Sequence, residues 1–112
     1  KYLSPKQKKE VLRIAKNTCF YCHAKDEKFA MDHFVPWNYI GQTEQYNMVP
    51  ACTPCNSSKH DKLTVPKYLD NIIKRNKNLE KLPMGYSAEF LTNMYEQSIV
   101  EYYGEEKDLW QK

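Results

Sequence analysis

Hydrophobic positions recur at helical spacing in several parts of this chain and predict helices on both sides of its middle. Ser4 and Gln7 form the two halves of a capping box, and the apolar stripe that follows predicts a helix over residues 5–17. A second amphipathic stretch, with lysines along its polar face, predicts a helix over residues 65–76.

The most regular hydrophobic pattern covers residues 87–103 and predicts the longest helix. Its apolar residues recur every three or four positions, and Gly104 follows as a suitable C-terminal cap. The last eight residues are mostly charged apart from Leu109 and Trp110, and they predict no element. Residues 63–112 are therefore expected to form a helical extension.

The middle of the chain predicts a small α+β unit. Residues 28–32 and 46–51 are expected to be short strands, separated by a polar loop that contains Pro36. A short helix is expected from residue 53 or 54 to about residue 61. Together these elements predict one α+β domain over residues 1–112. Because the chain begins without methionine, we expect that it is either processed or, as we favour, cut from a longer protein.

Charge adds one feature to this picture, because it is unevenly distributed. Residues 1–81 contain 15 Lys and Arg but 8 Asp and Glu, whereas residues 82–112 contain 2 and 6. A basic body with an acidic end favours a polyanionic partner such as nucleic acid. No apolar stretch is long enough to span a membrane, and residues 1–16 do not resemble a secretion signal. We therefore expect an intracellular, cytoplasmic protein.

All four cysteines lie in two Cys-x-x-Cys motifs, Cys19 to Cys22 and Cys52 to Cys55. Such a turn directs two thiolates at one ion, and two turns complete a tetrahedral structural Zn²⁺ site. Disulfides are the main alternative, but an intracellular chain with this spacing binds metal more often than it oxidises. His23 is a further candidate ligand, although four cysteines already complete the set.

Polar residues near the two motifs predict a second site with catalytic chemistry. Asp32 and His33 adjoin at the end of the first predicted strand, so their side chains point in different directions. Asn56 and His60 stand four residues apart on the predicted helix and share one face, beside Lys59. Such ligands suit a divalent cation such as Mg²⁺, Mn²⁺, Ni²⁺ or Zn²⁺, and a neutral imidazole can act as a general base.

The order and spacing of these residues resemble the zinc-containing branch of the HNH endonucleases, the ββα-metal nucleases. The resemblance covers residues 19–62, a little under half of the chain. It implies a zinc-stapled ββα-metal core, flanked here by the predicted N-terminal and C-terminal helices.

The resemblance also implies a role for each matching residue. His33 matches the general base that activates water, and Asp32 and Asn56 match ligands of the catalytic divalent cation. Asn47 matches the asparagine that holds the loop carrying the base. His60 falls where some members have a third ligand and many have glycine, so a metal ligand and a phosphate contact both remain open for it.

These roles imply an HNH-type endonuclease that cuts DNA to 5′-phosphate and 3′-hydroxyl ends, in a restriction, mobile-element or phage-defence protein of a prokaryote or phage. Lys59 and Lys62 are expected to contact backbone phosphates. RNA as substrate and a homodimer both stay open. The alternative class is a non-catalytic zinc-ribbon module that binds nucleic acid or protein. Such a module has no chemical need for Asp32, His33 and Asn56 together.

Overall fold

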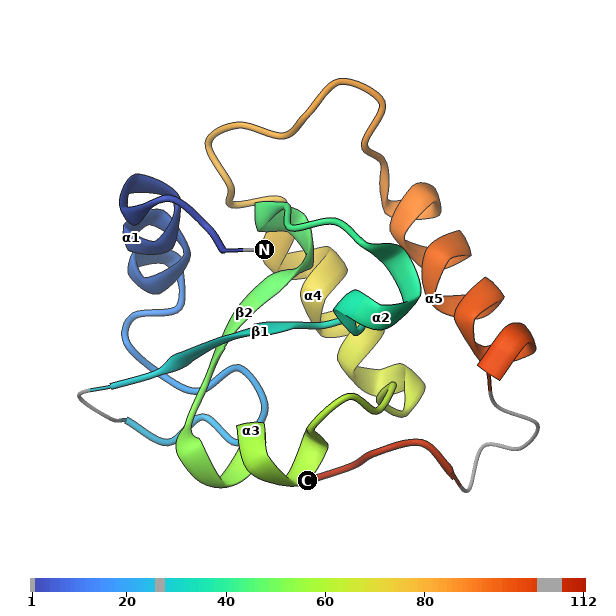
Figure 1. Cartoon of the computed structure of the whole chain (residues 1–112). Helices are drawn as coiled ribbons and strands as arrows, with labels where there is room; N and C mark the ends of the chain where they lie inside the picture. Colours follow the sequence, from blue (N-terminus) through green and yellow to red (C-terminus); the bar gives the residue numbers. More distant parts are fainter. Residues whose placement is uncertain (1, 26–27, 103–107) are drawn as a thin grey trace.

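The computed structural model describes residues 2–25, 28–102 and 108–112 of the chain. Two short strands pair at the centre, and the helices lie around them (Figure 1). The elements in chain order are the helix α1 (Pro5–Ile14), the strand β1 (Ala30–His33), the helix α2 (Trp37–Ile40), the 3₁₀ helix η1 (Gln45–Asn47), the strand β2 (Met48–Ala51), and the helices α3 (Thr53–Lys59), α4 (Pro66–Asn76) and α5 (Ala88–Tyr102). The predicted α+β fold class is confirmed.

The two strands pair antiparallel and bring the ends of the central segment together. Asp32 lies opposite Val49, and His33 lies opposite Met48. All four residues of β2 are buried, and α3 begins directly after it with Cys52 as its N-cap. The strand–strand–helix core therefore places the end of β1 beside α3.

The helix α1 begins as predicted and ends earlier than predicted. Both hydrogen bonds of the capping box form between Ser4 and Gln7. The helix stops at Ile14 because Lys16 and Asn17 have left-handed backbone angles, with φ of 53° and 54°. This turn directs the chain into the first Cys-x-x-Cys motif.

The loop predicted between the strands contains a helix that the hydrophobic pattern did not predict. The helix α2 has only four residues, so it is too short to show a period. Pro36 precedes it, and Gly41 ends it with φ of 62°, a conformation that glycine adopts without a steric penalty.

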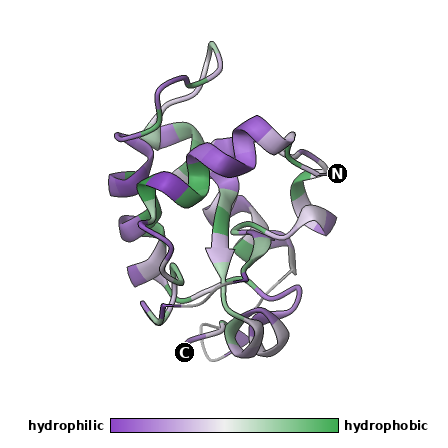
Figure 2. Ribbon diagram, turned by 90° about the vertical axis from the view of Figure 1, so that its left-hand side faces the viewer, coloured by the Kyte–Doolittle hydropathy of each residue, from purple (hydrophilic) through white to green (hydrophobic). Residues whose placement is uncertain are grey.

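The helices α4 and α5 pack their apolar faces into one core with the strands. Tyr68 and Ile72 of α4 and Leu91 and Tyr95 of α5 are buried. Hydrophobic residues lie along the central strands, whereas α1, which crosses the front of this view, is mostly hydrophilic (Figure 2). No helix in the described ranges is long and apolar enough to cross a membrane. Residue 103 and the predicted cap Gly104 lie outside the described residues.

The C-terminal segment, for which the sequence predicted no element, packs against the core. Trp110 forms a parallel β-bridge with Thr64, and its indole N–H donates to the Ser58 hydroxyl at 2.9 Å. The Trp110 ring makes an edge-to-face contact with the Tyr21 ring at a centroid distance of 5.0 Å. It stacks on the Tyr68 ring at a centroid distance of 5.8 Å. The end of the chain therefore lies beside α3 and the first cysteine motif.

Candidate metal centres and active site

The four cysteines converge on one point, although residues 23–51 separate the two motifs in the sequence. The sulfur atoms of Cys19, Cys22, Cys52 and Cys55 all lie within 4.8 Å of one another. Three of these side chains are buried, and all four are free thiols. Four sulfur donors in one cluster fit a closed tetrahedral site. The predicted four-cysteine metal-binding group is confirmed.

Backbone amides prepare part of this cluster for a cation. Burial alone would raise the pKa of Cys19, but hydrogen bonds from the backbone of Cys52, Cys22 and Tyr21 lower it to about 7. Burial, followed by the neighbouring sulfurs, raises the pKa of Cys55. Sulfur atoms crowded together favour the neutral thiol form, because thiolate charges repel one another. A bound cation offsets these charges, so the thiols lose their protons and become thiolates. The cluster therefore suits a bound metal ion better than four free thiols.

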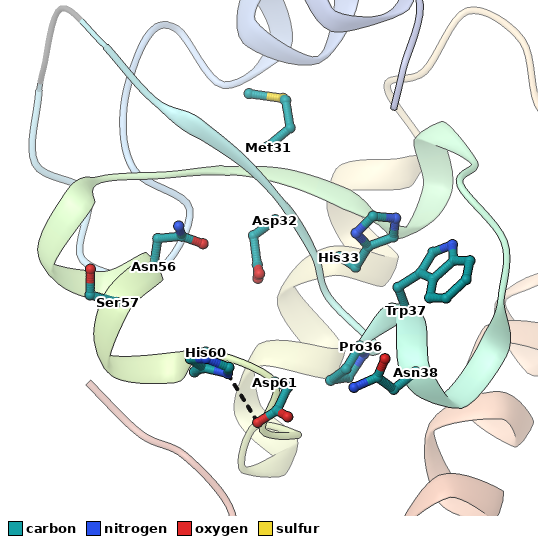
Figure 3. A pocket seen from close by; sticks show the side chains of 10 residues that line it. All are labelled: Met31, Asp32, His33, Pro36, Trp37, Asn38, Asn56, Ser57, His60 and Asp61. Carbon is teal, nitrogen blue, oxygen red and sulfur yellow. Dashed lines mark ion pairs between the residues drawn. The ribbon is translucent and has the colours of Figure 1, made fainter. Parts of the chain in front are cut away.

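A pocket of about 480 Å³ opens where β1, α2 and α3 meet (Figure 3). Four of the sequence-predicted site residues line it together with six others: Met31, Asp32, His33, Pro36, Trp37, Asn38, Asn56, Ser57, His60 and Asp61. The fold thus brings Asp32, His33, Asn56 and His60 to one cavity.

Asp32 lies at the centre of this pocket with its carboxylate held on one side (Figure 3). The Tyr21 hydroxyl donates to Oδ2 at 2.6 Å, and the Lys59 ammonium lies 3.1 Å from the same oxygen. Burial, reinforced by the Asp32 charge, raises the pKa of Tyr21, so the hydroxyl keeps its proton and donates. Both contacts use Oδ2, so Oδ1 is the oxygen that can meet a ligand in the pocket.

Lys59 does not lie at the surface, which corrects the expectation that it contacts a phosphate. Its side chain is fully buried, and its ammonium also donates to the His33 carbonyl at 3.1 Å. Burial lowers the pKa of Lys59, and the charge of Asp32 opposes that shift. Lys59 therefore ties α3 to the end of β1. Lys62, the other expected contact, is exposed.

His33 points away from Asp32, as adjacent residues on a strand must (Figure 3). Its Nε2 lies 2.9 Å from the Thr43 hydroxyl. A partner on one ring nitrogen orients an imidazole and selects its tautomer. The ring is half-buried, so a water molecule can reach it from the pocket.

Asn47 joins the start of β2 to the chain segment that follows His33. Its side-chain oxygen accepts from the Val35 N–H at 2.8 Å, and its amide donates to the Val35 carbonyl at 3.0 Å. The Asn47 carbonyl also accepts from the Phe34 N–H at 2.7 Å. The side chain is fully buried. These three bonds fix the backbone immediately after His33.

Asn56 and His60 reach the pocket in different ways. Asn56 lies within α3, and its half-buried side chain extends towards Asp32 (Figure 3). His60 was expected on the same helix, but α3 ends at Lys59. His60 is the C-cap, with φ of 53° and ψ of −122°, and its Nδ1 lies 3.2 Å from an Asp61 oxygen.

The backbone of His60 leads to a stability prediction. A side chain other than hydrogen is strained at this positive φ, by about 1–3 kcal/mol. We expect His60→Gly to be more stable than His60→Ala by about 1 kcal/mol or more, which raises the melting temperature by about 4–8 °C. Thermal unfolding of both variants measures the difference. Ser57, exposed inside α3, is the matched control and should rank alanine above glycine. Equal stability of the two His60 variants would contradict the strain.

Sequence reasoning missed several side chains that contact the predicted site residues, among them Tyr21 and Thr43. Tyr21 lies between the first two cysteines, and Thr43 lies in the loop before η1. Neither has a periodic or spacing signal, because each acts through one contact across the fold. Trp37 and Asn38, on the unpredicted α2, were missed for the same reason.

Comparison with known proteins places this site in context. Residues 19–62 match the family model described as HNH endonuclease. No curated protein matches the sequence. Among solved structures, the chain is similar to the Type II-C Cas9 enzyme from Actinomyces naeslundii, with a TM-score of 0.52 and 20% identity. That match covers 100% of this chain and 14% of the Cas9 chain, and at this identity it concerns the fold alone.

Proposed function

We propose that this protein is a metal-dependent endonuclease that hydrolyses phosphodiester bonds in DNA, and the match of residues 19–62 to the HNH endonuclease family model supports this proposal. The observation that carries the proposal is the convergence of Asp32, His33 and Asn56 on one pocket beside the four-cysteine cluster. A module that only binds nucleic acid has no need for that convergence.

The donor atoms of the pocket fit a hard or borderline divalent cation, such as Mg²⁺, Mn²⁺ or Ni²⁺. Asp32 offers Oδ1 because Oδ2 is already held, and Asn56 offers an amide oxygen on the same side. When bound, the cation would stabilise negative charge on the phosphate and on the leaving oxygen. In this proposal the four-cysteine cluster holds a structural zinc that is separate from the reaction.

His33 is the proposed general base. Thr43 orients the imidazole, and the bonds from Asn47 fix the backbone just after it. The imidazole takes a proton from the water whose oxygen forms the new bond to phosphorus. The bond from phosphorus to the 3′-oxygen breaks, and that oxygen takes a proton from solvent to give 5′-phosphate and 3′-hydroxyl ends. Lys62 is exposed and lies three residues after the end of α3, and we propose it as a contact to a backbone phosphate.

Plasmid cleavage tests the proposal. Supercoiled DNA incubated with the protein and Mg²⁺ or Mn²⁺ should become nicked, and EDTA should prevent it. Sequencing of the cut ends then reports their chemistry, and labelled RNA of the same sequence tests the second substrate. DNA binding without cleavage in any divalent metal would instead favour the non-catalytic zinc-ribbon module. A restriction, mobile-element or phage-defence role would follow from the specificity of the cuts.

His60 is proposed as a third ligand of the cation. Asp61 holds its Nδ1, so Nε2 is the nitrogen that can face the pocket, and metal-bound histidines usually have such a carboxylate partner. An imidazole ligand favours Mn²⁺, Co²⁺ and Ni²⁺ over Mg²⁺. We therefore expect His60→Ala to shift the metal preference of cleavage towards Mg²⁺ with little loss of maximal rate.

Cleavage rates across a metal series measure this preference. Ser57→Ala, which changes another pocket residue on the same segment, is the control and should keep the wild-type ranking. An unchanged ranking in His60→Ala, with weaker DNA binding and a shallower salt dependence, would assign His60 to phosphate contact instead.

A further inference from the structure

We propose that Tyr21 is a positioning residue that couples the four-cysteine centre to the metal ligand Asp32. This inference rests on the proposed function, since it concerns the cation that Asp32 would bind. Its first observation is the 2.6 Å hydrogen bond from the Tyr21 hydroxyl to Oδ2 of Asp32. Both side chains are buried, with exposures of 4% and 7%. Water therefore does not replace this donor easily.

Tyr21 touches both centres at once. It stands between Cys19 and Cys22 in the first motif, and its backbone is one of the groups that hydrogen-bond the Cys19 sulfur. Its side chain crosses from that motif to the end of β1, where Asp32 lies. One residue thus connects a sulfur ligand of the structural centre to an oxygen ligand of the catalytic pocket.

The ring of Tyr21 has little freedom to move. Phe20, Tyr68 and Trp110 surround it with edge contacts at centroid distances of 5.1, 5.3 and 5.0 Å. Close-packed aromatic rings of this kind hold one orientation, because any rotation displaces their neighbours. The position of the hydroxyl is therefore set by the cysteine motif and the aromatic cluster.

The Asp32 carboxylate is held through one oxygen. Tyr21 and Lys59 both bind Oδ2, at 2.6 and 3.1 Å, and they approach from the cysteine motif and from α3. Two partners on one oxygen prevent the carboxylate from rotating about its last torsion and leave Oδ1 directed at the pocket. Groups that orient a metal ligand in this way typically change metal affinity by about 10–100-fold when they are removed.

Tyr21→Phe removes the hydroxyl and keeps the ring, so it tests positioning rather than packing. We expect this variant to bind Mn²⁺ about 10–100-fold more weakly than wild type, with an equal rise in the Mn²⁺ concentration needed for half-maximal cleavage. Mn²⁺ alone is the probe, titrated by electron paramagnetic resonance without DNA. Zinc content and thermal unfolding, measured on the same samples, show that the four-cysteine centre stays intact.

Tyr95→Phe is the matched control. Tyr95 is as buried as Tyr21, and its hydroxyl donates to the Thr64 carbonyl at 2.6 Å rather than to Asp32. Tyr95→Phe should lower the stability of the protein about as much as Tyr21→Phe does, and it should leave the affinity for Mn²⁺ unchanged. In an Asp32→Asn background, Tyr21→Phe should add no further loss of affinity, because the oxygen that it positions no longer binds the cation as a carboxylate.

The outcomes separate this inference from the function on which it rests. Equal Mn²⁺ affinity in wild type and Tyr21→Phe, with DNA cleavage intact, would overturn the coupling and leave the nuclease standing. An equal loss in Tyr95→Phe would also overturn it, because the effect would then come from general loosening of the core. A wild-type protein that neither binds Mn²⁺ nor cleaves DNA would overturn both.

Discussion

Cys22→Ser is expected to unfold most of the protein at room temperature. Apparent binding energies of structural zinc reach about 10–16 kcal/mol, whereas a whole small domain is stable by about 5–15 kcal/mol. Losing one thiolate therefore removes an energy comparable to the entire stability. Cys22 is the best cysteine to change because it is only half-buried, so the substitution disturbs packing less than at the other three.

Zinc content by mass spectrometry and the thermal unfolding curve measure this effect together. Wild type stripped by a chelator should reproduce the unfolded state of Cys22→Ser, and zinc added back should restore only the wild type. A Cys22→Ser protein that melts at the wild-type temperature would show that the cluster does not contribute zinc-linked stability.

His33→Ala is expected to abolish cleavage while the protein keeps its fold, its zinc and its affinity for DNA. A general base acts on the transition state and contributes about 10²–10⁴-fold in rate, with little effect on ground-state binding. Single-turnover cleavage at saturating Mn²⁺ measures the loss, and added imidazole should restore part of the rate to the alanine variant.

Asp32→Ala and Asn56→Ala give the contrasting behaviour. These variants should require more Mg²⁺ or Mn²⁺ for cleavage, and added imidazole should not rescue them, because they lack a ligand rather than a base. If His33→Ala cut DNA at the wild-type rate, the proposed base would be wrong, whatever the metal variants did.

The features that could be predicted from the sequence are those that depend on residues close together in the chain. The capping box at Ser4 needs only residues within one turn, and the four-cysteine cluster needs only two matched spacings. Asp32 and His33 follow the same logic, since alternation along β1 alone directs them to different sides. In each case the physical reason lies within a few residues of the chain.

What could not be predicted depends on contacts between distant segments. Lys59 looks like a surface lysine beside Asn56, and only the pairing of α3 with β1 shows that its ammonium reaches Asp32. His60 was placed on a helix by counting four residues, but the helix ends one residue earlier. The Tyr21 hydroxyl bond spans eleven positions of sequence and joins the first cysteine motif to β1.

The packing of Trp110 has a practical consequence for anyone who shortens this protein. A fragment ending at residue 62, where the family match ends, would lose the indole that covers the Tyr21 ring and bonds to Ser58. It would also remove Tyr68, the other ring that packs on Tyr21 from beyond residue 62, and so expose the aromatic edge beside the first cysteine motif. Expression boundaries drawn from the family match would thus leave an exposed apolar surface, prone to aggregation, next to the candidate pocket, whereas boundaries that retain residues 108–112 keep this surface covered.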